Sequence, residues 1–233
     1  MEEFMTASFW LAVGQIIMIE ILLGGDNAVV IALACRNLPG KQRTQGIIYG
    51  TMGAIVLRVI LIAFALALLA VPFLKIVGAL LLLWIGVKLL QPDDDSDHHI
   101  SSSDKLWGAV KTVIIADLVM SVDNVLAIAG AAQGAAQEHQ LPLVIFGLLV
   151  SIPIIVMGSQ LVLKLMERFP IVITLGAMLL GWIAGQMAYT DPAIKAYLPE
   201  SAVWGYAAAA AGALLVLATG KAMQLRRKPT EAA

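Results

Sequence analysis

The stretch Glu20-Ile-Leu-Leu-Gly-Gly-Asp-Asn27 decides the fold of this chain, because about a hundred residues later it returns as Asp117-Leu-Val-Met-Ser-Val-Asp-Asn124. In both copies an acid is followed six residues on by an Asp-Asn pair, inside a long apolar run. A carboxylate near the middle of a membrane segment costs roughly 2.5–3.5 kcal/mol. An Asp-Asn pair that only caps a helix belongs at a helix end, whereas these pairs lie within hydrophobic runs. The four acids therefore indicate a functional site.

The composition predicts a polytopic membrane protein. Of the 233 residues, 60% are hydrophobic and 13% are charged, and the mean hydropathy is +0.89. Soluble proteins carry about 25% charged residues. Apolar runs of about 20 residues without two-residue alternation predict helices. The basic residues lie in short loops and in the tail, so no nucleic-acid partner is expected, and the single cysteine, Cys35, excludes an internal disulfide.

Seven apolar segments predict an all-α membrane protein with seven transmembrane helices in a single transporter domain over residues 1–233. The segments span about residues 9–35, 46–70, 72–90, 106–132, 142–164, 170–189 and 202–223. The long polar loop between them, residues 92–105, is rich in Asp and contains two His residues. It is interpreted either as a weak collector of metal ions or as a solvated linker, and the linker is favoured.

An internal repeat relates the two parts of the chain. A shift of 97 residues superposes the two motif copies and also places Ile48-Tyr49-Gly50 onto Ile145-Phe146-Gly147; one further residue places Pro72 onto Pro170. The predicted parts are repeat 1 at about 9–91, repeat 2 at about 106–190 and an extra C-terminal helix at about 202–223. A unit of three spans ends on the side opposite to its start, so the two repeats must be inverted. Many secondary transporters have this architecture and bind substrate near the midplane, between the repeats.

The distribution of Lys and Arg predicts the orientation. If the N-terminus lies outside, the inside loops and the tail hold twelve Lys and Arg residues, and the outside holds only Lys75 and Lys195. Cytoplasmic loops carry the excess of positive charge in membrane proteins. We therefore expect a multi-pass protein of the bacterial inner (plasma) membrane, with the N-terminus outside and the C-terminus in the cytoplasm.

The spacing within the motif predicts a local distortion of the first helix. Positions seven apart, such as Glu20 and Asn27, lie on nearly the same helix face, whereas Asp26 lies about 120° away from Glu20. Because glycine tolerates strained backbone, Gly24-Gly25 is expected to supply the distortion that brings Asp26 to the same point. The second copy has Ser121-Val122 at this place, so a matching break there is less assured.

The paired motif offers four carboxylates and two amides, all of them oxygen donors. Such sites favour hard divalent cations such as Mn²⁺, Mg²⁺ and Ca²⁺. Zinc or copper would favour His or Cys, which no segment places beside the motif. Four ionised acids exceed the charge of one divalent ion, so proton exchange is a further hypothesis. Arg58 lies within the second segment, where its side chain either snorkels or pairs with an acid.

The doubled motif on a seven-span hydrophobic chain resembles the TerC family of integral membrane proteins, in particular its YjbE/YkoY-type members, within the LysE exporter superfamily. The resemblance covers residues 9–223. It implies a role in Mn²⁺ efflux, linked in some members to the supply of metal to exported enzymes; other members are associated with tellurite resistance. The ion-binding residues that the resemblance implies at matching positions are Glu20, Asp26, Asn27, Asp117, Asp123 and Asn124.

We therefore expect a carrier that exports Mn²⁺ by alternating access, with the ion and the lipid bilayer as partners, no resident cofactor, and a homo-oligomer left open. The rivals are a Ca²⁺ or broad cation/proton exchanger of the same fold, a non-transporting membrane partner in metal supply, and an exporter of a small zwitterion. A zwitterion carrier would need a cation for the substrate carboxylate, and Arg58 is the intramembrane candidate. An enzyme is not expected, because no nucleophile–base pair or phosphate loop is present.

Overall fold

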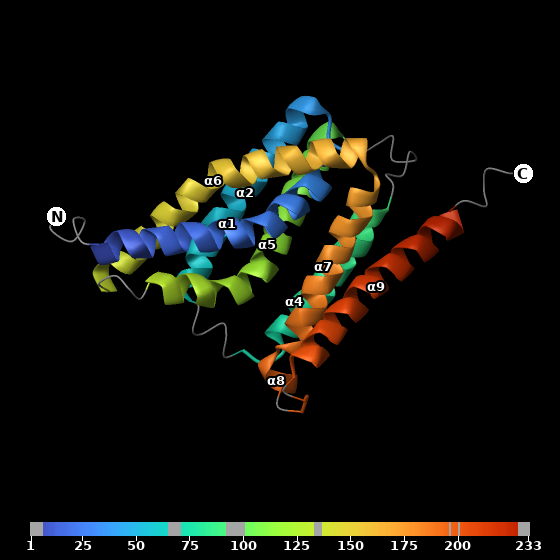
Figure 1. Ribbon diagram of the computed structural model, residues 1–233. Coiled ribbons are helices and arrows are strands. Elements are labelled where there is room, and N and C mark those ends of the chain that lie inside the picture. Colours follow the sequence, from blue (N-terminus) through green and yellow to red (C-terminus); the bar gives the residue numbers. More distant parts are fainter. Residues whose placement is uncertain are drawn as a thin grey trace, which may run out of the picture.

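The part of the chain that the computed structural model describes is all-helical (Figure 1). It comprises residues 7–64, 71–91, 101–132, 137–195, 197–199 and 201–227. The helices are α1 (Ala7–Cys35), α2 (Gly40–Ala63), α4 (Leu74–Leu90), α5 (Ser102–Ala132), α6 (Gln137–Arg168), α7 (Ile171–Tyr189), α8 (Pro192–Lys195) and α9 (Ala202–Arg227). Apart from the short α8, each of these helices overlaps one of the predicted apolar segments, with bounds that differ by several residues at some ends. The predicted all-α fold is confirmed.

Within the described residues, four helical stretches are long and apolar enough to cross a membrane. They are Gly40–Leu61, Leu148–Arg168, Ile171–Tyr189 and Ala202–Leu225, and Gly24–Cys35 forms a shorter apolar stretch. At 1.5 Å per residue, the 17 residues of α4 span about 26 Å, slightly less than the roughly 30 Å hydrocarbon core. Several helices extend beyond the predicted apolar segments, since an α-helix satisfies its own backbone and can continue into the polar region.

Helices α2 and α5 pack against each other and run in the same direction. Gly50 on α2 is so close to α5 that a Cβ atom added to it would lie 2.9 Å from the side chain of Val113. Two turns further along α2, Arg58 reaches Asp117, which lies one turn beyond Val113 on α5. Because both contact positions advance together, the two helices are parallel.

Helices α1 and α6 form a second parallel pair, and they lie side by side in Figure 1. A Cβ atom added to Gly24 on α1 would lie 3.4 Å from Cγ1 of Ile155 on α6. One turn further along both helices, a Cβ atom added to Gly158 would lie 3.4 Å from the Cβ atom of Ala28. Helices α4, α7 and α9 pack together beside these two pairs (Figure 1).

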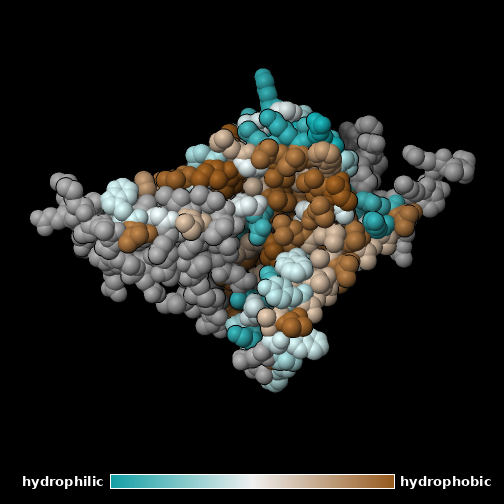
Figure 2. Space-filling view, viewed as in Figure 1, coloured by the Kyte–Doolittle hydropathy of each residue, from teal (hydrophilic) through white to brown (hydrophobic). Residues whose placement is uncertain are grey.

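Hydrophobic side chains cover the middle of the molecule, and hydrophilic ones gather at the upper end of the view in Figure 2. Large apolar side chains point outward from several helices; examples are Trp84 on α4, Met157 and Leu161 on α6, and Leu214 and Leu215 on α9. An apolar surface of this extent is typical of a protein surrounded by lipid. Figure 1 shows that α2 begins and α6 ends at the upper end.

At this end, arginine side chains tie helix termini together. The Arg43 guanidinium near the start of α2 pairs with Glu167 in the last turn of α6. Arg36, just after α1, donates hydrogen bonds to the carbonyl oxygens of Leu89 and Gln91 at the end of α4. Cations are favoured near helix C-termini because the last carbonyl groups have no partner within the helix.

At the opposite end, the fully buried Asp191 joins α4 to α8. Its carboxylate accepts hydrogen bonds from the backbone N–H groups of Phe73 (3.2 Å), Lys75 (3.1 Å), Ile76 (3.2 Å) and Ala193 (2.8 Å). Three of these donors lie at the start of α4, where backbone N–H groups lack helical partners. Asp191 therefore caps α4 from a distant part of the chain, an arrangement that the sequence does not reveal.

We predict that Asp191→Ala lowers the free energy of unfolding by about 2 kcal/mol or more, because buried N–H donors lose their acceptor. Asp191→Asn keeps one acceptor oxygen and should cost less. Thermal unfolding of the detergent-solubilised protein measures both, with Asp104→Ala, an exposed acid in the first turn of α5, as the control. Equal stability of Asp191→Ala and the control would contradict the prediction.

Helices α7 and α9 are in backbone contact through glycine residues. A Cβ atom added to Gly212 on α9 would collide with the carbonyl oxygen of Gly181 on α7, and one added to Gly185 would collide with that of Ala208. Small residues at such spacings let membrane helices approach closely. The glycine residues therefore allow the backbones of α9 and α7 to approach closely.

We predict that Gly212→Ala lowers the free energy of unfolding by about 1–3 kcal/mol, since the added methyl group forces α9 away from α7. Gly108→Ala is the matched control: it also lies in a helix, and a Cβ atom there has nothing within 4 Å. Thermal unfolding compares the two variants. A similar melting temperature for both would show that the backbone contact between α7 and α9 contributes little.

Candidate functional site

The first copy of the motif lies within α1, which is a continuous α-helix from Ala7 to Cys35. The prediction of a distorted helix at Gly24-Gly25 is therefore wrong. Gly24 faces α6, where a Cβ atom added to it would be in ordinary van der Waals contact with Ile155. Gly25 is exposed, and a Cβ atom added to it would have nothing within 4 Å. The helix thus keeps Asp26 and Asn27 on different faces, about 100° apart.

Asn27 is the most unusual polar group of the first copy. Its side chain is 3% exposed, and neither its amide nitrogen nor its amide oxygen has a hydrogen-bond partner among the described residues. Buried polar side chains are almost always hydrogen-bonded, since an unsatisfied donor or acceptor costs about 1–3 kcal/mol. The neighbouring Asp26 is half-buried. A buried amide that has no partner among the described residues is suited to binding a further polar or cationic group.

The second copy lies in the continuous helix α5 and holds a buried ion pair. Arg58 of α2 donates a hydrogen bond from Nη2 to Oδ1 of Asp117 at 2.5 Å, and from Nε to Oγ of Ser121 at 3.1 Å. Ser121 in turn donates to Oδ2 of Asp117 at 3.1 Å. The side chains of Arg58 and Asp117 are 2% and 7% exposed. Arg58 therefore pairs with an acid and does not snorkel.

The sequence does not indicate which acid pairs with Arg58. An arginine inside an apolar segment must find a counter-charge, because the isolated charge is expensive to remove from water. Several acids lay within reach on the sequence, and the choice of Asp117 depends on the rotation of α2 against α5. The small residues Gly50 and Gly53 bring the two helices close enough for the contact.

The two helices that carry the motif copies also pack against each other. Val30 of α1, three residues after Asn27, belongs to the same buried cluster as Ala116 and Met120 of α5, which flank Asp117. The backbone segments of the two copies are thus brought to the same region of the core.

For Glu20, Asp123 and Asn124 the structure describes the helical backbone alone, so their predicted roles stay predictions. Among the described side chains, no three acidic, His or Cys groups gather as a metal centre. Most of the predicted polar loop, residues 92–100, lies outside the described residues. Of the six predicted site residues, the structure therefore describes the side chains of Asp26, Asn27 and Asp117.

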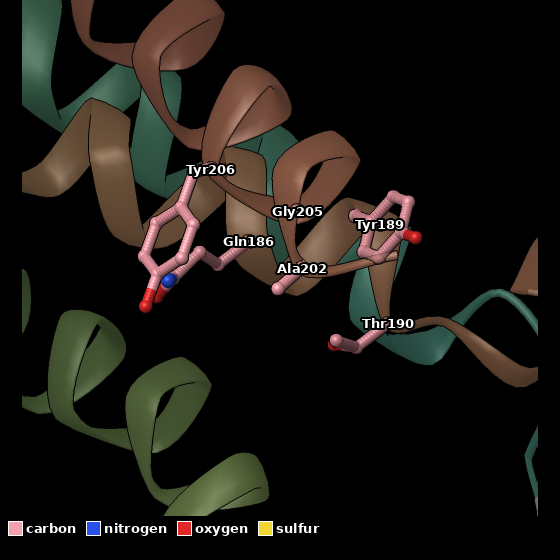
Figure 3. A pocket seen from close by; sticks show the side chains of 6 residues that line it. All are labelled: Gln186, Tyr189, Thr190, Ala202, Gly205 and Tyr206. Carbon is pink, nitrogen blue, oxygen red and sulfur yellow. The ribbon is translucent and has the colours of Figure 1, made fainter. Parts of the chain in front are cut away.

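A pocket of about 360 Å³ lies elsewhere, between the end of α7 and the start of α9 (Figure 3). Its lining residues are Gln186, Tyr189, Thr190, Ala202, Gly205 and Tyr206. In Figure 3 the polar ends of Gln186 and Tyr206 point to the same side. None of the lining residues belongs to the motif, so this pocket is separate from the predicted site.

The comparison with known protein families agrees with the doubled motif. Residues 5–228 match the integral membrane protein TerC family, which is nearly the whole chain. This chain belongs to the TerC family. It is therefore an integral membrane protein, and its resemblance to that family, deduced above from the motif, is confirmed.

Several bacterial membrane proteins are similar to this TerC family member. It is 44% identical over 185 residues to membrane protein YjbE of Bacillus subtilis (strain 168), covering 79% of this chain and 82% of YjbE. It is 26% identical over 210 residues to YkoY of the same organism, covering 80% and 63%. It is 25% identical over 195 residues to the inner membrane protein YoaE of Escherichia coli (strain K12), covering 75% and 36%. No solved structure matches the chain.

We predict that Asp117→Asn lowers the free energy of unfolding by about 3–5 kcal/mol, because it leaves the Arg58 guanidinium buried without its counter-charge. The double variant Asp117→Asn/Arg58→Gln should recover most of this loss. Glu167→Gln, which breaks the exposed pair with Arg43, should cost less than about 1 kcal/mol. Unfolding in a denaturant series measures all three; a double variant no more stable than Asp117→Asn would contradict the prediction.

Proposed function

We propose that this TerC family protein exports divalent metal cations, Mn²⁺ in the first place, across the bacterial inner membrane. The observation that carries the proposal is the buried and unpartnered amide of Asn27 next to the half-buried Asp26. Both residues belong to a motif whose second copy lies on α5. Helices α1 and α5 pack against each other. A carboxylate and an amide oxygen are ligands that hard divalent cations prefer.

The proposed site combines both copies of the motif, and the ion is its transported substrate. Glu20, Asp26 and Asn27 contribute from α1, and Asp117, Asp123 and Asn124 contribute from α5. No resident cofactor and no enzymatic reaction are proposed. Protons that replace the ion on the carboxylates would supply the exchange step, since closely spaced acids cannot all stay ionised without a cation.

The proposed architecture has two inverted repeats of three transmembrane helices, followed by α9. The packing of the helices supports it. Exchanging α1, α2 and α4 for α5, α6 and α7 turns the contact between α1 and α6 into the one between α5 and α2. The same exchange leaves the contacts of α4 with α7 and of α1 with α5 unchanged. The parallel course of both helix pairs agrees with chains that cross the bilayer at each helix from α1 to α6.

In the proposed orientation, the end of the molecule that carries Arg36, Arg43 and Glu167 faces the cytoplasm, and the N-terminus lies outside. The excess of Lys and Arg on this side supports the orientation. The relative YoaE is described as an inner membrane protein, which supports the proposed location in the inner membrane. A homo-oligomer is compatible with the outward apolar surface, which lipid alone can equally cover.

A carrier of Ca²⁺ or of several cations is the alternative within the same fold, because the oxygen donors suit all of these ions. A non-transporting membrane partner in metal supply is the alternative from another class. The unpartnered amide of Asn27 favours a bound ligand over a purely structural motif, since a structural amide would have its hydrogen bonds satisfied.

We predict that purified protein in proteoliposomes transports Mn²⁺ and that Asp26→Ala and Asp123→Ala each reduce the flux at least about tenfold, since each removes a charged ligand. Asp104→Ala is the matched control, because Asp104 is an exposed acid outside the motif. Competition by Ca²⁺ and Mg²⁺ ranks the selectivity. A folded wild-type protein that transports no divalent cation would overturn the proposal and favour the non-transporting partner.

A further inference from the structure

The two copies of the motif have the same helical surroundings but different chemistry. The shift of 97 residues that superposes the copies places Arg58 onto Ile155 and Ser121 onto Gly24. The structure agrees with this correspondence in space. Arg58 of α2 contacts Ser121 of α5, and Ile155 of α6 packs against Gly24 of α1. The same place in the two halves is thus filled by a guanidinium in one and by a hydrocarbon side chain in the other.

The polar groups of the two copies differ accordingly. In the second copy, both carboxylate oxygens of Asp117 accept hydrogen bonds from within the protein, one from Arg58 and one from Ser121. In the first copy, neither polar atom of the Asn27 side chain has a partner among the described residues, and Asp26 is half-buried. In the second copy, the hydrogen-bond acceptors of Asp117 have donors. In the first copy, the amide nitrogen and oxygen of Asn27 still require hydrogen-bond partners.

We propose that Arg58 is the fixed counter-ion of Asp117, so that the transported divalent cation is bound by Asp26 and Asn27 of the first copy and not by Asp117. This inference rests on the proposed function and changes it at one residue: Asp117, one of the six proposed ligands, becomes the partner of Arg58. Arg58 then sets the charge of the site. The four motif acids carry four negative charges, and one guanidinium reduces this sum to three, which a divalent ion and one proton neutralise.

The inference distinguishes a charge-balancing role of Asp117 from a role as a ligand of the ion. If Asp117 only balances Arg58, then Asp117→Asn harms ion binding because it leaves a positive charge that repels a divalent cation in a medium of low dielectric constant. Removing that charge as well must restore binding. If Asp117 is itself a ligand, the second substitution cannot restore what the first removed.

The experiment measures the dissociation constant of Mn²⁺ for the purified, folded full-length protein by electron paramagnetic resonance of the free ion. We expect Asp117→Asn to weaken binding at least about tenfold, and Asp117→Asn/Arg58→Gln to return to within about threefold of wild type. Asp26→Asn should also weaken binding, and adding Arg58→Gln should not rescue it. Arg58→Gln alone should bind Mn²⁺ at least as tightly as wild type, because it leaves an additional negative charge.

The controls separate this role from a structural one. Arg43 lies on the same helix as Arg58 and also pairs with an acid of another helix, Glu167, but outside the motif. Glu167→Gln and Glu167→Gln/Arg43→Gln should therefore leave the Mn²⁺ dissociation constant unchanged. If Arg58 were only a clamp between α2 and α5, Arg58→Gln would weaken binding, whereas charge balance requires that it does not.

A double variant as weak as Asp117→Asn, or a loss of binding in folded Arg58→Gln, overturns the inference while the proposed function stands, provided that wild type binds and transports the ion. A wild-type protein that is folded and binds no divalent cation overturns both. The inference is supported if Arg58→Gln restores Mn²⁺ binding in Asp117→Asn but not in Asp26→Asn.

Discussion

A guanidinium and a carboxylate that are both withdrawn from water must stay together, and Arg58 and Asp117 meet this constraint across two helices. Each alone would be a costly charge in the apolar interior, so the pair restricts how α2 can rotate or slide against α5. Gly50 and Gly53 make the close approach of these helices feasible. The position of Asp117, and with it the course of the second motif copy, therefore depends on a residue in the first half of the chain.

Among the described side chains, the first motif copy is positioned by apolar packing. Gly24 and Ala28 of α1 contact Ile155 and Gly158 of α6, and this contact holds the helix, while the amide of Asn27 has no hydrogen-bond partner among the described residues. The α1–α6 and α2–α5 contacts thus place a hydrocarbon side chain beside Gly24 and a guanidinium beside Ser121. A site built from both motif copies would therefore be chemically asymmetric.

Much of the fold could be predicted from the sequence, because a membrane requires long apolar helices and these are visible as runs of hydrophobic residues. The motif acids were visible for the same reason, since charges stand out in such runs. What depends on the rotation of one helix against another was not visible. The partner of Arg58, the capping of α4 by Asp191 and the contact of Gly212 with α7 all belong to this class. The predicted distortion at Gly24-Gly25 is wrong because glycine permits a helix break without requiring one, and α1 continues through both residues.

The glycine contact between α7 and α9 has a mechanical consequence. Where two backbones are in contact, no side chain can change its rotamer to absorb a displacement. Helix α9 therefore has to move together with α7 as a rigid body. Asp191 lies just after α7 and accepts hydrogen bonds from the start of α4, so the same rigid body includes α4. These three helices, of which α4 lies far from α7 and α9 in the sequence, would then turn as one body, and relative motion would be confined to their boundary with the two parallel helix pairs.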